Sequence, residues 1–137
     1  MERIVVAAKA GEDEPWLADA AAHLAEQTGG VVIVVSVDGV DVEMGSPMPR
    51  SEYAELARKA ADGVAARIRE SGREVDAHVR PGKVVPGVLM FAEEHDGDLI
   101  LVGASKRGPV ARRVLGDVSL ELVRRSRRPV MVITPPA

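Results

Sequence analysis

The stretch LILVGASKRGPVARRVLGDVSLELVRR, residues 99–125, decides the fold class of this chain of 137 residues. It opens with a continuous apolar run over residues 99–102, continues into Gly103, and ends in an amphipathic helix predicted over about residues 118–125. A continuously apolar strand followed by a loop and a helix is typical of a parallel sheet covered on both faces. The stretch therefore predicts an α/β protein, with its loop at the edge where such sheets bind ligands.

Four further segments rich in Val, Ile or Leu are predicted to be strands, at residues 4–8, 31–37, 75–79 and 130–133. The segment EVDAHV at residues 74–79 alternates in polarity and so is typical of a half-exposed edge strand. Helices are predicted between the strands, over about residues 15–28, 51–71 and 86–96. This alternation predicts a doubly wound sheet with right-handed crossovers and helices on both faces.

Composition indicates one globular domain over residues 1–137, because the length is that of an ordinary domain. Charged residues make up 28% of the chain and hydrophobic residues 46%, and no apolar run is long enough to span a bilayer. The start MERIVVAAKAGEDE has too short an apolar run for a secretion signal, and the chain has no cysteine. We therefore expect a cytoplasmic protein without membrane contact.

Charge and residue types exclude several classes of function. The net charge of −3 gives no overall attraction to nucleic acid, and only three aromatic residues are present to stack on bases. The basic run RRSRR at residues 124–128 is interpreted as a solvated helix end rather than a nucleic-acid patch. His23, His78 and His95 lack metal-ligand spacing, and acid pairs such as Glu12 with Glu14 are interpreted as solvated helix ends. The histidine spacing thus predicts no metal site, and the absence of a G-x-S-x-G elbow predicts no hydrolase triad. We therefore expect no catalytic residue and no enzyme.

Three segments are predicted to meet at the ligand-binding edge of the sheet: residues 8–11, residues 37–39 and the residues from Gly103 onward. Gly103 and Gly116 border a loop whose backbone N–H groups would face an anion at a helix start, although glycine there is more often a turn residue. The irregular stretch DGVDVEMGSPMPR, residues 38–50, follows the second strand at the same edge. It is either a lid over a site or a tolerated surface excursion, and the sequence favours neither.

Taken together, these residues resemble the universal stress protein family. The resemblance is carried by Gly103 at the strand end, the basic loop, VLGDVS at residues 114–119 and SRRPVMVITPP at residues 126–136. Residues 3–37 and DGDLILVGAS at residues 96–105 extend it over nearly the whole chain. The resemblance implies a three-layer fold with five parallel strands in the order 3-2-1-4-5 and a role in the stress response.

Family members that bind ATP carry the pattern G-x2-G-x9-G-[ST], which this chain matches only in part. Gly103 and Gly116 fit the first and last glycines, but Lys106 replaces the second glycine and Asp117 replaces the Ser or Thr. After the first strand, nucleotide-binding members usually have an aspartate near the ribose, and this chain has Lys9 instead. The resemblance also implies an adenine contact after the second strand, and Val37 there is compatible with it.

Asp117 is predicted to cap the last helix and to accept from the N–H groups that a phosphate would need. Its charge would also oppose a triphosphate by about 1–4 kcal/mol. We therefore predict a non-enzymatic, stress-associated regulatory protein with a degenerate nucleotide site beside Asp117 and Val118. In the alternative, Lys9, Lys106 and Arg107 hold the phosphates of AMP or ATP with Mg. A third hypothesis, slow nucleotide hydrolysis, lacks an identifiable base.

The last predicted strand, PVMVI at residues 129–133, would expose unpaired backbone groups if it lies at the sheet edge. The resemblance implies a homodimer formed through this strand, with an interface of Val130, Met131, Val132 and Ile133. Pro135 and Pro136 directly after it would limit further growth of the sheet.

Overall fold

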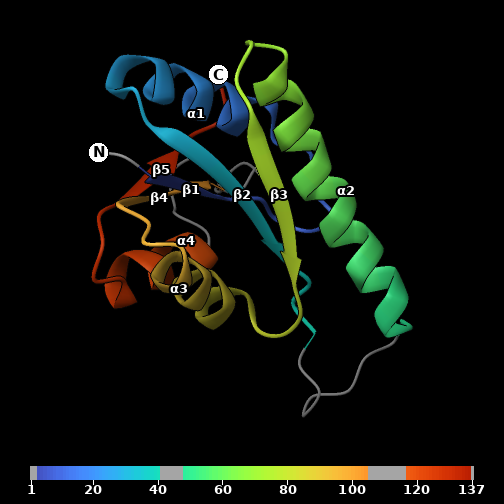
Figure 1. Cartoon of the computed structure of the whole chain (residues 1–137). Coiled ribbons are helices and arrows are strands. Elements are labelled where there is room, and N and C mark those ends of the chain that lie inside the picture. The colour runs from blue at the N-terminus through green and yellow to red at the C-terminus, as the bar shows by residue number, and fades with distance from the viewer. Residues whose placement is uncertain (1–2, 41–47, 105–116, 137) are drawn as a thin grey trace.

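The computed structural model describes residues 3–40, 48–104 and 117–136. Strands and helices alternate along these residues, as β1 (Arg3–Ala7), α1 (Pro15–Thr28), β2 (Val31–Val37), α2 (Arg50–Arg69), β3 (Val75–Arg80), α3 (Val84–Glu94), β4 (Leu99–Gly103), α4 (Asp117–Arg125) and β5 (Val130–Ile133). Figure 1 shows the sheet between two layers of helices. The predicted α/β class is confirmed.

The five strands form one parallel sheet in the order β3-β2-β1-β4-β5, as the family resemblance implied. The chain winds from β1 outward through β2 to β3, and then returns to the other side of β1 with β4 and β5. The winding direction therefore reverses at β1, where Ala7 pairs with Val35 on one side and with Val102 on the other. The predicted edge position of the alternating strand β3 is also confirmed.

Each face of the sheet has its own apolar core because strand side chains alternate between the faces. Helices α1 and α2 cover one face with small residues such as Ala21, Ala61 and Ala65, which let the helices lie close to the sheet. Helices α3 and α4 cover the other face, where Phe91 and Leu122 are fully buried. These two cores fix the carboxyl ends of the strands, where the candidate site lies.

The helix boundaries follow local signals with two departures. Helix α1 spans the predicted residues: Pro15 lies in its first turn, and Gly29 ends it in the left-handed conformation at φ 72°. Helix α3 begins at Val84, before Pro86, because proline is tolerated in a first turn where its missing N–H has no intrahelical partner. Helix α2 ends at Arg69, two residues earlier than predicted. Within the described residues, none of the helices has the length and apolarity needed to span a bilayer.

Candidate functional site

The candidate site lies where β1 separates from β4 at their carboxyl ends. The β1–β4 ladder ends with the pair Ala7 and Val102. Ala8 stays with β2, because its N–H donates to the carbonyl of Val35 at 2.9 Å. The backbone N–H of Lys9 instead turns away and donates to Oε1 of Glu14, also at 2.9 Å. A crevice of this kind, at the reversal of winding, is the usual ligand position in such sheets.

The carbonyl of Gly103, the last residue of β4, accepts hydrogen bonds from two side chains. Nζ of Lys9 donates to it at 2.5 Å, and Oγ of Ser119 donates to it at 3.1 Å. Ser119 is fully buried in the first turns of α4, so this helix is tied to the end of β4. Both acceptor positions of the carbonyl oxygen are therefore occupied by groups of the chain itself.

Glu14 lies beside the same glycine, and sequence reasoning missed it. The prediction that Glu14 is a solvated helix end is wrong, because only 2% of its surface is exposed. Its Oε2 lies so close to Gly103 that any side chain at that position would collide with it. Burial raises the pKa of Glu14, while the N–H and the positive charge of Lys9 act in the opposite direction. The available signal was an acid directly before Pro15 and five residues after a lysine.

The crevice is linked to the last strand through Trp16 in the first turn of α1. Nε1 of Trp16 donates to the carbonyl of Ile133 at 3.3 Å, and the N–H of Ala104 donates to the same oxygen at 2.8 Å. The ends of β4, β5 and the start of α1 therefore meet beside Gly103.

The residues at the end of β2 make contacts other than those of Lys9, Glu14 and Gly103. Val37 is buried and faces α3, where a Cβ at Gly87 would lie 2.9 Å from its Cγ2. Asp38 is buried as well, and its Oδ1 accepts from the N–H groups of Val40 at 2.9 Å and Gly82 at 3.0 Å. The side chain of Asp38 thus holds the end of β2 against the turn before α3. Of the predicted site residues, the structure brings Lys9 and Gly103 into contact, and it places Val37 in the α3 core.

Comparison with known proteins shows which family the chain belongs to. A model of the universal stress protein family matches residues 1–134. The chain belongs to the universal stress protein family. A search of curated proteins finds no match.

Solved structures of universal stress proteins share this fold over nearly the full length. A universal stress protein from Archaeoglobus fulgidus is 26% identical, with a TM-score of 0.76, and the match covers 97% of this chain and 98% of that one. A universal stress protein from Archaeoglobus fulgidus in complex with dAMP is 25% identical, with a TM-score of 0.72 and the same coverage. A universal stress protein in complex with cAMP is 20% identical, covers 96% of both chains with a TM-score of 0.72, and shows likeness of fold alone.

The residues that would complete the family's nucleotide pattern lie mostly between β4 and α4 in the sequence. Lys106, Arg107 and Gly116 are outside the described residues. Asp117 is the first residue of α4, it is exposed, and its carboxylate accepts no hydrogen bond from any described residue. This differs from the predicted N-cap, because a cap accepts from amides two or three residues ahead. Val118 packs partly against the core under α3 and α4.

Outside the crevice, two arginines of the basic run at residues 124–128 pair with acids. Arg125 contacts Glu121 at 3.5 Å and Arg128 contacts Glu93 at 2.8 Å. Nε of Arg128 also donates to the carbonyl of Gly97 at 2.6 Å. Arg125 and Arg128 are thus engaged by groups of the chain itself. Among the described residues, no three acidic or histidine side chains gather as a metal site would require.

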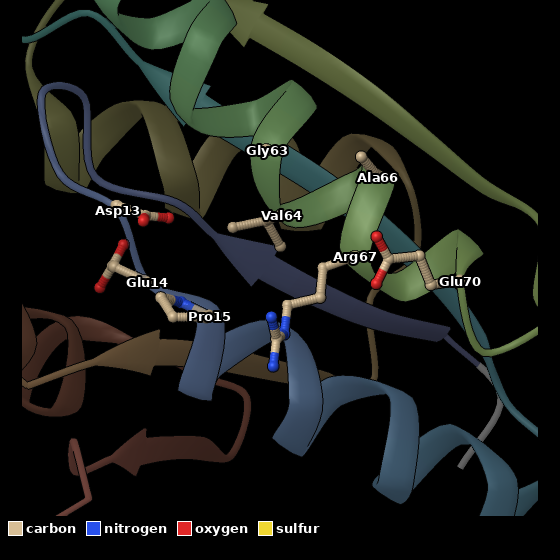
Figure 2. A pocket seen from close by; sticks show the side chains of 8 residues that line it. All are labelled: Asp13, Glu14, Pro15, Gly63, Val64, Ala66, Arg67 and Glu70. Atoms are coloured by element: carbon tan, nitrogen blue, oxygen red, sulfur yellow. The ribbon is translucent and has the colours of Figure 1, made fainter.

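A separate cavity of about 280 Å³ lies between the turn before α1 and helix α2 (Figure 2). Figure 2 shows Arg67 extending from α2 toward α1, where its Nε bonds Oδ1 of Asp19 at 2.7 Å. A neighbouring cavity of about 430 Å³ shares Asp13 and Gly63 with it. Glu14 lines the first cavity and also lies beside Gly103, so this cavity borders the crevice, whereas Lys9, Val37 and Gly103 line neither cavity.

Strand β5 forms one edge of the sheet in this universal stress protein fold. Val130 and Val132 pack against the α3–α4 core, and Ile133 packs against the core under α1 and α2. Met131 is 42% exposed. Because Ile133 directs its carbonyl to Ala104 of the β4 side, the backbone groups of Val130 and Val132 face outward. In the described part of the chain, no hydrogen bond reaches these groups.

Proposed function

We propose that this universal stress protein is a non-enzymatic regulatory protein with a degenerate nucleotide site. One observation carries this function: the ammonium of Lys9 is bonded to the carbonyl of Gly103, inside the crevice where a ligand would enter. Relatives that bind nucleotides usually have an aspartate in place of Lys9, according to the family pattern. In this chain, residue 9 is a lysine instead, and its ammonium is already bonded to the carbonyl of Gly103.

The energetic cost of opening the crevice supports this function. A hydrogen bond that involves a charged group contributes about 1.5–3 kcal/mol. A ligand that displaces Lys9 from Gly103 would lose that amount, which corresponds to about one to two decades in affinity. The carboxylate of Glu14, buried beside Gly103, would in addition repel phosphate groups. Both effects weaken the binding of an adenine nucleotide.

A second candidate function is the binding of AMP or ATP with Mg through Lys9, Lys106 and Arg107. The Archaeoglobus fulgidus relative in complex with dAMP, 25% identical, favours this candidate. It requires Lys9 to exchange the carbonyl of Gly103 for a phosphate oxygen. The two candidates therefore differ in what Lys9 bonds when nucleotide is present.

The first experiment measures nucleotide in the purified protein and then the effect of added nucleotide. We expect no adenine nucleotide on acid release and chromatography, and no rise in Tm when Mg-ATP or Mg-AMP is titrated. A near-stoichiometric adenine nucleotide in the purified protein would contradict the degenerate site and support the second candidate.

Two variants locate the block. The double change Lys9→Asp with Glu14→Ser restores an acid after β1, removes the buried carboxylate, and leaves α1 with a favourable N-cap. We expect Mg-ATP to raise the Tm of this variant by a measurable amount. Asp117→Ser alone is the matched control, because Asp117 is exposed and makes no bond to a described residue. A rise in Tm with Asp117→Ser alone would show that Asp117, rather than Lys9 and Glu14, blocks the site.

We also propose that the protein acts in the cytoplasm as a homodimer joined through β5. The outward backbone groups of Val130 and Val132 support the dimer, because a second strand would satisfy them. The exposed side chain of Met131 on the same strand adds apolar surface to cover.

A further inference from the structure

The opposite edge of the sheet, β3, is built differently from β5. The carbonyl of Arg80 accepts from the N–H of Asp38 at 2.9 Å, so the polar backbone groups of Arg80 face β2. Because these groups alternate in direction along a strand, those of Val75, Ala77 and Val79 face away from the sheet. These three residues form the free edge of β3.

Two arginines from α2 bind carbonyls of this free edge. The Nη2 atom of Arg69 donates to the carbonyl of Val75 at 2.7 Å. The Nη1 atom of Arg58 donates to the carbonyl of Ala77 at 3.2 Å, and the same atom contacts Asp62 at 3.5 Å. Figure 1 shows why both can reach the strand, since α2 runs alongside β3. Two of the three outward carbonyls are thus bound by cations.

The two edges of the sheet therefore differ in chemistry. On β5, no described residue donates to the outward backbone groups of Val130 or Val132. On β3, an approaching strand would have to displace two guanidinium groups before its own N–H groups could bind. Charged side chains at a strand edge are a recurrent means of preventing edge-to-edge pairing.

We infer that Arg58 and Arg69 close the β3 edge to a second copy of this chain, so that the sheet pairs only through β5. This inference extends the proposed β5 dimer. A sheet with two open edges would add a copy at each end and continue to grow, whereas a sheet with one open edge stops at two copies. The two arginines thus determine which surface forms the interface and where assembly ends.

The test compares Arg58→Ala/Arg69→Ala with Arg67→Ala. Arg67 lies on the same helix, but it pairs with Asp19 of α1 and contacts no β3 carbonyl. Light scattering after size exclusion is measured over a series of protein concentrations. We expect the average mass of the double variant to rise with concentration to about twice the wild-type mass or more. The mass of Arg67→Ala is expected to stay at the wild-type value.

Amide hydrogen exchange shows whether a mass increase arises at β3. The N–H groups of Ala77 and Val79 face outward, so they should gain protection in the double variant at concentrations where its mass rises. If the wild-type protein is a monomer, the β5 dimer fails, and the double variant should then form a dimer with protected β3 amides. The mass from light scattering and the amide protection of β3 therefore distinguish two failures. One is that Arg58 and Arg69 do not block the β3 edge, and the other is that β5 forms no interface.

A folded double variant with the wild-type mass at every concentration would overturn the inference, and so would growth without protection of β3. Far-UV circular dichroism establishes folding. If the double variant does not fold, Arg58→Ala and Arg69→Ala are compared singly with Arg67→Ala. Each single variant frees one carbonyl and is expected to give a smaller rise in mass than the double variant. If both single variants keep the wild-type mass, the inference about Arg58 and Arg69 is likewise overturned.

Discussion

A single carbonyl oxygen, that of Gly103, binds Lys9 from one side and Ser119 from the other. Glu14 is buried next to it, which is costly for a carboxylate unless nearby groups compensate. The backbone N–H and the positive charge of Lys9 supply only part of that compensation, because burial still raises the pKa of Glu14. The sequence was sufficient to single out Lys9 and Gly103 from the family pattern. It was insufficient for Glu14, because its burial depends on the path of the turn after β1.

Glu14→Gln tests the buried carboxylate through the pH dependence of stability. Burial raises the pKa of Glu14 above its ordinary value of 4.5 in the folded state, so the folded protein retains this proton to higher pH than the unfolded chain. The contribution of Glu14 to stability therefore falls as pH rises from about 4.5 through the raised pKa. Glutamine keeps an oxygen for the Lys9 N–H and removes this loss. We expect Glu14→Gln to be more stable than wild type at neutral pH in urea denaturation.

The control for this experiment is Glu26→Gln, a change of the same type at an exposed position of α1 whose charge does not act on Glu14. It should keep the wild-type dependence of unfolding free energy on pH. A Glu14→Gln protein with the wild-type pH profile would refute the view that burial dominates at this residue.

Among the elements, the apolar strands and the capped helix α1 follow patterns that are local in sequence, and local patterns predicted them. Helix α3 starts before Pro86 because the first turn tolerates proline. The arginine contacts of α2 with β3 have no such local pattern, because they join residues up to 19 positions apart across two elements. Local sequence therefore predicts an element better than it predicts which neighbour that element touches.

Two glycine-to-alanine substitutions test packing around the helices and strands, and they are expected to change the free energy of unfolding in opposite directions. A Cβ at Gly97, before β4, would lie 2.8 Å from Cγ2 of the fully buried Val5. We expect Gly97→Ala to reduce the free energy of unfolding by about 1–3 kcal/mol, because a β-branched core residue cannot move aside. Gly63 lies inside α2, and a Cβ there meets no atom within 4 Å. Gly63→Ala should therefore stabilise the protein by about 0.5–1 kcal/mol.

Chemical denaturation of both variants, side by side with wild type, measures these two changes. Equal effects of the same sign would show that packing at Val5 does not decide the outcome at Gly97.

For the whole molecule, the order of strands leaves β3 and β5 as the two edges of the sheet. The family resemblance predicted this order, and the alternating sequence of β3 predicted its edge position. The difference between the edges required the structure, because it depends on the direction of each carbonyl and on the reach of Arg58 and Arg69. The β5 interface itself remains a prediction.

Met131→Glu tests that interface. Met131 is exposed on β5, and a charge there would have to lose water for two copies to pair. We expect light scattering to give a dimer for wild type and a lower mass, toward the monomer, for Met131→Glu. Leu56→Glu adds the same charge at an exposed position on α2 and should leave the dimer mass unchanged. A wild-type monomer, or equal masses for both variants, would contradict a β5 dimer.

The central position of β1 has a consequence for how the chain folds as it is synthesised. Arg3 bonds Asp98, 95 residues further along, and Trp16 bonds Ile133, 117 residues further along. Such distant contacts must wait for loop closure over most of the polypeptide, which makes folding slow. On the ribosome, β1 and β2 would be available early, but the other flank of β1 would stay bare until β4 leaves the exit tunnel. The nascent chain therefore exposes the unpaired backbone groups of β1, beside apolar side chains that β4 and its helices do not yet cover, during most of its translation, the period in which a chaperone would have something to bind.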